Sequence, residues 1–113
     1  MSEFEQKRAE KIVGALATKR RPPPAVREQV DLVFRVVGQS VELYELRADW
    51  RGGDAMHEQP VAKATYVKAQ GSWKLFWMRS DQKWHRYDPK PMLKELEQVV
   101  AEIDADPHGC FWG

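Results

Sequence analysis

The sequence contains one cysteine, Cys110, in 113 residues, so no intrachain disulfide can form. A domain without disulfides fits a reducing compartment, and we expect a cytoplasmic protein. Residues 1–11 are charged and hold no apolar stretch of the kind found in signal peptides. No apolar run approaches the roughly 20 residues that a membrane-spanning helix needs, so we expect no membrane segment.

The sequence also lacks an excess of charge of one sign, since 18 Lys and Arg nearly balance 17 Asp and Glu and the formal net charge is +1. This balance excludes a strong polycation, and any site for a polyanion must be a local patch. The positive charge is concentrated in residues 60–90, which carry seven Lys or Arg against two acids and hold three of the five Trp. We therefore expect any anion-binding surface in this segment.

No motif of established chemistry is present. His108 and Cys110 carry metal-ligating atoms, with His57, His85 and Asp106 as further candidates. Structural zinc sites use paired ligands such as Cys-x2-Cys with a second pair downstream, and the sequence supplies no second pair. A buried cysteine in the closing segment explains Cys110 without a metal. We expect a non-enzymatic protein that uses no metal and no cofactor.

The apolar pattern at the two ends of the chain predicts helices. Ser2 and Glu5 have the spacing of a capping box, and an apolar stripe runs through Phe4, Ile12, Val13, Leu16 and Ala17. We predict a helix over residues 1–21 and an extended Pro-rich linker over 22–29. Asp88-Pro89 is typical of a helix start, which predicts a second helix over 88–105 and a tail over 106–113.

Between the helices, the pattern predicts five antiparallel strands within residues 30–87. Gly38-Gln39, Gln70-Gly71 and Asp81-Gln82 are the expected turns, and a loop at 51–60 follows a strand that ends at Trp50. The first turn places Val36 opposite Val41 and Arg35 opposite Glu42. Short links and terminal helices predict a single α+β domain over residues 1–113, with an antiparallel meander sheet and a helix on either side of it in sequence.

The strands after residue 60 have two faces of different composition. Counting from the turns places Trp73, Trp77 and Trp84 on a core face, beside the small residues Ala62 and Ala64. The opposite face is predicted to carry the candidate ligand-binding residues Lys63, Lys74, Phe76, His85 and Tyr87. Aromatic rings between cations suit single-stranded nucleic acid, because bases stack on the rings and phosphates meet the cations.

The chain resembles one family in four segments: Ala62-Lys63-Ala64-Thr65-Tyr66-Val67-Lys68, Trp73-Lys74-Leu75-Phe76-Trp77-Met78-Arg79, Lys83-Trp84-His85-Arg86-Tyr87 and the ending Gly109-Cys110-Phe111-Trp112-Gly113. It is a family of small bacterial proteins described as a domain of unknown function. The resemblance runs from about Val30 to Gly113 and implies a stand-alone bacterial domain. The family has no established activity, so the resemblance gives no residue a role.

The residues therefore favour a binding protein whose sheet holds single-stranded nucleic acid or another anionic ligand. The alternative is a protein-interaction or homodimerisation module that buries the same aromatic face.

Overall fold

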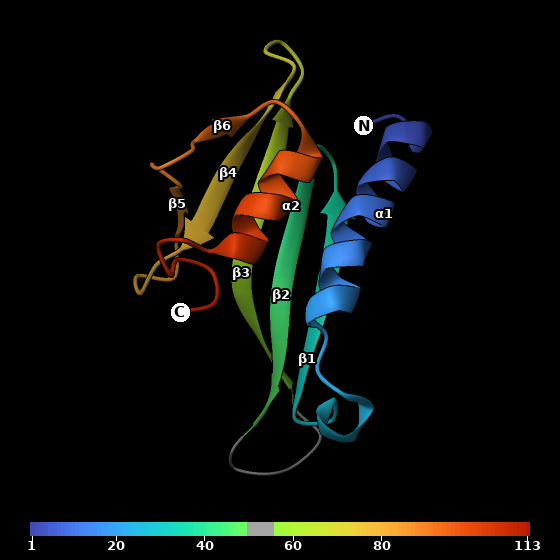
Figure 1. Ribbon diagram of the computed structural model, residues 1–113, viewed down its shortest axis with the longest axis vertical. Helices are drawn as coiled ribbons and strands as arrows, with labels where there is room; N and C mark the ends of the chain where they lie inside the picture. Colours follow the sequence, from blue (N-terminus) through green and yellow to red (C-terminus); the bar gives the residue numbers. More distant parts are fainter. Residues whose placement is uncertain (50–55) are drawn as a thin grey trace.

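The computed structural model describes residues 1–49 and 56–113, and these form two layers. The elements in chain order are α1 (Glu3–Arg20), the short 3-10 helix η1 (Pro24–Val26), β1 (Val30–Val37), β2 (Ser40–Ala48), β3 (Met56–Val67), β4 (Ser72–Met78), β5 (Trp84–Arg86), β6 (Met92–Leu93) and α2 (Leu96–Ala105). The strands form one antiparallel sheet, and both helices lie against the same side of it (Figure 1). The expected α+β class is confirmed, and β6 adds a two-residue strand to the expected five.

Helix α1 begins as the sequence predicts. The Ser2 hydroxyl accepts a hydrogen bond from the Glu5 N–H, and the Glu5 carboxylate accepts one from the Ser2 N–H. Its buried residues are Ala9, Val13, Leu16 and Ala17. Phe4 was expected in this stripe, and that prediction is wrong: the residue is 77% exposed. Nine residues are about two and a half helical turns, so Phe4 points away from the side that carries Val13.

The Pro-rich linker is only partly extended. Arg21 and Pro23 have extended backbones, and η1 then forms a tight turn at Pro24–Val26 that leads into β1. The first hairpin is confirmed in register, with Val36 opposite Val41 and Arg35 opposite Glu42. Gly38 has a φ of 58°, which suits the first central position of a type II′ turn.

Strand β3 begins earlier than expected, at Met56 rather than after Pro60. Pro60 lies within the strand, opposite Tyr44, where the register shifts at a β-bulge. The residue without a partner is Val61, and the local disruption of the ladder at a bulge tolerates the neighbouring proline. It also allows the consecutive residues Val61 and Ala62 both to be buried. The rest of the expected loop, with Gly52-Gly53-Asp54, and the expected strand end at Trp50 lie outside the described residues.

Two further loops set which side of the sheet each later residue faces. The β3–β4 loop spans residues 68–71 instead of the expected pair, which shifts the register by two and leaves the faces as predicted. The β4–β5 loop has three residues between Arg79 and Lys83, with Gln82 in the left-handed region at φ 62°. This is the three-residue loop with a bulge, and it shifts the register by one. A shift of one turns every residue of β5 to the other face.

The second helix starts later than predicted, at Leu96 rather than at Asp88. Within the intervening residues, β6 pairs with β4 at Trp73 and Lys74, while β5 pairs with β4 at residues 76–78. Between the two, the Leu75 N–H donates to the Pro91 carbonyl and the Tyr87 N–H donates to the Leu75 carbonyl. Residues 88–95 thus complete the hydrogen bonding along one edge of β4, which a helix there would leave unpaired.

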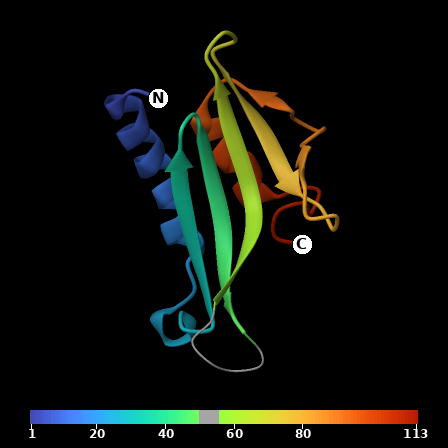
Figure 2. The same ribbon diagram turned by 180° about the vertical axis from the view of Figure 1, so that it is seen from behind.

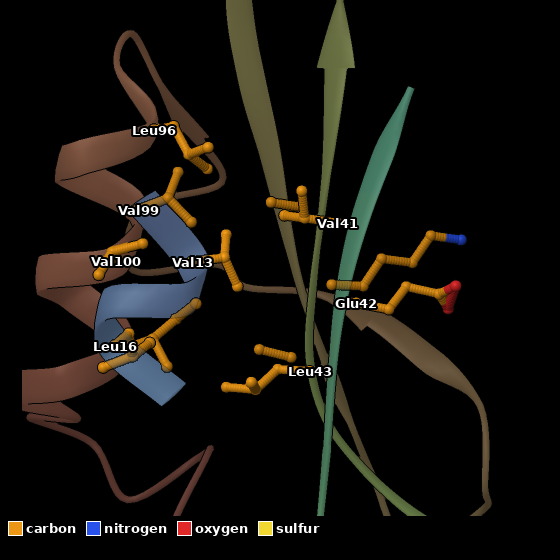
Figure 3. A pocket seen from close by; sticks show the side chains of 12 residues that line it. Val13, Leu16, Val41, Glu42, Leu43, Leu96, Val99 and Val100 are labelled. Atoms are coloured by element: carbon orange, nitrogen blue, oxygen red, sulfur yellow. The ribbon is translucent and has the colours of Figure 1, made fainter. Parts of the chain in front are cut away.

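The core lies between the sheet and the two helices. Figure 3 shows side chains of both helices directed toward β2, namely Val13, Leu16, Leu96, Val99 and Val100 opposite Val41 and Leu43. The space left among them is about 10 Å³, which is room for at most about one water molecule. A ligand must therefore bind elsewhere. None of the helices in the described part of the chain has the length and apolar character to cross a membrane.

Candidate nucleic-acid interface

The sheet face turned away from the helices is uncovered by any described element. In Figure 2 the strands lie in front and both helices lie behind them. Glu42 of β2 marks this open face, because its side chain points away from the helices while its neighbours Val41 and Leu43 point toward them (Figure 3). We call this surface the open face.

An aromatic ring lies between two cations in one row across the open face. In the observed register, Lys63 of β3 is directly opposite Phe76 of β4, and Phe76 is directly opposite Arg86 of β5. Directly opposed residues of antiparallel strands point to the same side, with Cβ atoms about 4.5–5.5 Å apart. Phe76 is partly exposed. We call these three residues the Phe76 row.

Lys74 and Trp84 extend the Phe76 row on the same face. Trp84 is opposite Met78, and it precedes Arg86 by two residues on β5, toward the loop. Lys74 precedes Phe76 by two residues on β4 and is exposed. The open face between β3 and β5 thus carries two partly exposed aromatic rings and three cations. The placement of Lys63, Lys74 and Phe76 on one face, away from the core, is confirmed.

The predicted placement of His85, Tyr87 and Trp84 is wrong, because the three-residue loop inverts β5. His85 is opposite Trp77 on the helix side of the sheet, where its Nε2 lies 2.8 Å from Asp81 Oδ2. Tyr87 has no exposed surface and belongs to the core. Trp84, expected in the core, is on the open face instead.

The cations of the open face differ in how far they are neutralised. Lys63 is directly opposite Glu42, yet no ion pair joins them, and the Glu42 carboxylate accepts a hydrogen bond of 2.8 Å from the Tyr44 hydroxyl. Neither Lys63 nor Lys74 has an ion-pair partner within the described ranges. Arg86 pairs with Asp88 at 2.9 Å, but both side chains are more than 70% exposed. Such exposed pairs contribute little and exchange readily with other partners.

The β1–β2 half of the open face is internally compensated. Arg35 forms an ion pair with Glu58, and its guanidinium lies 4.7 Å from the centre of the Tyr44 ring. Burial and the hydrogen bond to Glu42 raise the pKa of Tyr44 to about 12, so its hydroxyl stays protonated. Among the described residues of the open face, the cations without an ion-pair partner, Lys63 and Lys74, therefore lie in the β3–β5 half.

The helix side of the sheet holds a polar cluster that the sequence did not reveal. The Tyr87 hydroxyl donates a hydrogen bond of 2.6 Å to the Glu102 carboxylate, which also pairs with Lys90 at 3.3 Å. The Tyr87 hydrogen bond lowers the pKa of Glu102. Phe111 packs on the Tyr87 ring at 5.0 Å. No sequence signal links residues 87 and 102, because the pairing depends on the late start of α2.

The C-terminal tail is held by Asp106 at the end of α2. Its carboxylate accepts hydrogen bonds from the backbone N–H groups of Phe111 and Trp112. Burial raises the pKa of the Cys110 thiol, which disfavours a reactive thiolate. Across the described ranges, no three His, Cys, Asp or Glu side chains are grouped closely enough to hold a metal ion.

These features define a small α+β protein with one sheet face packed on helices and the other face open. The chain belongs to the family described as a domain of unknown function (DUF3024), whose model matches residues 1–113. This agrees with the resemblance seen in the Trp-rich stretches and the C-terminal segment. Neither the curated proteins nor the solved structures contain a match to the chain.

Proposed function

We propose that the protein is a non-catalytic binding protein that holds single-stranded nucleic acid on the β3–β5 half of its open face. The observation that carries this proposal is the Phe76 row, in which a ring is flanked across two strands by Lys63 and Arg86. Single-stranded nucleic acid needs this combination, because its bases stack on rings while its phosphates require cations nearby.

The row lies on a rigid surface, which supports the proposal further. Phe76 and Lys63 are in the interior of the sheet, and the hairpin that carries Trp84 and Arg86 is fixed at its loop. In this loop the Asp81 carboxylate accepts a hydrogen bond from the Lys83 N–H and forms a second hydrogen bond with the His85 ring. Binding would therefore require little ordering of the protein, which reduces the entropic cost of association.

Homodimerisation through the same face is the alternative. The open face is less suited to it, because Lys63 and Lys74 have no partner in the described part of the chain and would be buried between two copies. The most exposed large apolar residue, Phe4 at 77%, belongs to the helix layer, whereas Val37 at 55% and Met92 at 36% lie on the open face in the row of Lys74. A dimer would have twice the 13.1 kDa mass of the chain.

The test is the affinity for fluorescently labelled oligothymidylate and oligouridylate as a function of salt, measured by anisotropy. Three phosphate contacts, at Lys63, Lys74 and Arg86, predict a slope of log affinity against log salt of about −2, since each contact on a single strand contributes about −0.7. Lys63→Gln should reduce the magnitude of this slope by about 0.7. Lys11→Gln makes the same charge change on an exposed residue of α1 and should leave the slope unchanged.

Absence of binding at low salt would refute the proposal. So would an equal effect of Lys63→Gln and Lys11→Gln, because the charge would then act through the whole molecule rather than through the open face. Elution at twice the monomer mass, reversed by Phe76→Glu, would support the dimer instead.

A further inference from the structure

A cavity separate from the open face lies at one end of the molecule, among the first turns of both helices and the ends of β3 and β4. Its volume is about 230 Å³, which is below the ~300–1,000 Å³ typical of sites for drug-sized ligands. Its wall is the aromatic pair of Tyr66 and Trp73, whose ring centres are 5.2 Å apart. Both residues face the helix side of the sheet, so the cavity is on the opposite side from Phe76.

Two polar groups of this wall have no hydrogen-bond partner among the residues that the structure describes. Trp73 is only 8% exposed, yet its indole N–H has no acceptor in the described part of the chain. No buried side-chain nitrogen or oxygen among the described residues lacks a partner, so this N–H is not sealed from solvent. The Tyr66 hydroxyl is likewise without a protein partner within the described ranges. The indole N–H of Trp112 differs in this respect, since it donates to the Ile103 carbonyl at 2.8 Å.

The charged groups around the cavity balance, which restricts the ligand. Its lining holds the carboxylates of Glu5 and Glu95, the cations Arg8 and Lys94, and the N-terminal residue Met1, whose amino group acts on Glu5. Arg8 is already paired at 2.6 Å with Glu97, which is outside the lining. Side chains occupy the backbone N–H groups of Ser2 and Glu5 at the start of α1 and that of Glu95 at the start of α2. A phosphate or an isolated carboxylate would gain little net attraction here. An uncharged planar molecule with both hydrogen-bond donors and acceptors matches the lining.

We propose that this cavity binds a nucleobase, as a free base or as a nucleoside. The ring would lie against Tyr66 and Trp73, with its acceptor atoms toward the indole N–H and the phenol and its amino groups toward the carboxylates. An adjoining hollow lined by Gln39, Lys68 and again Tyr66 leaves space for the sugar. This site does not depend on the binding of nucleic acid to the open face.

The experiment follows the indole N–H signals of the ¹⁵N-labelled full chain by NMR, with each signal assigned by a Trp→Phe variant. Adenosine, guanosine, cytidine and uridine are titrated separately to their solubility limits. At least one should shift the Trp73 signal saturably and leave the Trp84 signal in place. Tyr66→Phe should weaken that nucleoside's binding by about threefold to tenfold, the effect of losing one hydrogen bond. Tyr44→Phe, the matched change on the open face, should have no effect.

The proposal is overturned if no nucleoside shifts the Trp73 signal, if Trp84 shifts with it, or if Tyr66→Phe binds the nucleoside as tightly as the parent. The corresponding 5′-monophosphate should bind no more tightly than the nucleoside, and tighter binding would contradict an uncharged ligand. The same spectra separate the two sites, because an oligonucleotide on the open face should shift Trp84. Failure of either site therefore leaves the other independently testable.

Discussion

Two tyrosine hydroxyls donate to glutamate carboxylates in this protein, and they differ in burial. Tyr87 has no exposed surface and donates to Glu102 at 2.6 Å, whereas Tyr44 is partly exposed and donates to Glu42 at 2.8 Å. A hydrogen bond to a charged acceptor contributes about 1.5–3 kcal/mol when loss of the donor leaves the acceptor buried. Water can replace the lost donor only where the site is open.

Tyr87→Phe should therefore lower the free energy of unfolding by about 1.5–3 kcal/mol. The change removes one oxygen, keeps the ring on Phe111, and leaves the Glu102 carboxylate with only Lys90. Tyr44→Phe is the matched control and should lower it by less than about 1 kcal/mol. Urea unfolding of the three proteins measures both values. Equal effects would show that burial of the Tyr87 pair has no energetic consequence.

Asp31 links the end of α1 to the edge strand β1. Two hydrogen bonds from Arg21, at 2.8 and 2.9 Å, lower the pKa of Asp31 to about 2; burial opposes this shift, and the Leu32 N–H adds to it. The unfolded value is about 3.9. A lowered pKa means that this contribution to stability is complete above pH ~4 and is lost as the pH falls toward ~2.

Asp31→Asn should destabilise the protein at neutral pH and should make the loss of stability between pH ~4 and ~2 smaller than in the parent. Asp88→Asn is the control, because Asp88 and its partner Arg86 are both highly exposed. Urea midpoints measured across this pH range report the difference. If Asp31→Asn and the parent lose stability in parallel, the Arg21 pair does not contribute.

The β4–β5 loop decides which side chains reach the open face. Its third residue, Gln82, has a φ of 62°, where a residue other than glycine is strained by about 1–2 kcal/mol. Gln82→Gly should therefore raise the free energy of unfolding by up to about 1 kcal/mol, after the greater flexibility of glycine in the unfolded chain is subtracted. Gln82→Val should lower it, since a branched side chain fits this backbone poorly.

Gln70→Gly provides the comparison, because Gln70 lies in the preceding loop without a positive φ. That change should lower stability or leave it unchanged, as measured by urea unfolding. Stabilisation by Gln70→Gly and not by Gln82→Gly would contradict the assigned loop geometry.

Three hairpin loops within the described ranges explain why the fold was predictable from the sequence and the candidate site only partly. Gly38 identifies a two-residue turn, and the register of β1 and β2 follows from it. The β3–β4 loop is two residues longer than its sequence suggests. A shift of two residues leaves the faces of β4 unchanged, so Lys74 and Phe76 lie on the predicted face. The β4–β5 loop is longer than predicted by one residue, and nothing in the sequence Ser80-Asp81-Gln82 indicates the extra residue. His85 and Tyr87 were therefore assigned to the wrong face.

Partners distant in sequence account for the other differences. Asp88-Pro89 has the residues of a helix start, but the edge of β4 offers unpaired hydrogen-bonding groups, and Met92–Leu93 pairs with it as β6. That competition depends on where β5 ends, which local sequence does not encode. The tail contacts at Asp106 and the Tyr87–Glu102 pair follow from the same arrangement.

For the molecule as a whole, the small net charge conceals a separation between its surfaces. The β1–β2 half of the open face neutralises its own charges through Arg35, Glu58 and Glu42, while the β3–β5 half keeps Lys63 and Lys74 without partners in the described ranges. The helix layer carries its own exposed cation and ring, Lys11 and Phe4. The open face and the helix layer cannot be distinguished by composition alone. They differ in their position relative to the sheet.

The most direct measurement compares matched double variants of the two layers in their affinity for a single-stranded oligonucleotide at low salt. Loss of one stacked base is expected to weaken binding by about 1–3 kcal/mol, or roughly fivefold to 150-fold. Lys63→Gln with Phe76→Ala should therefore reduce affinity at least fivefold, whereas Lys11→Gln with Phe4→Ala should leave it within about twofold. Equal losses in the two variants, or no loss in the first, would contradict the assignment of the open face as the binding surface.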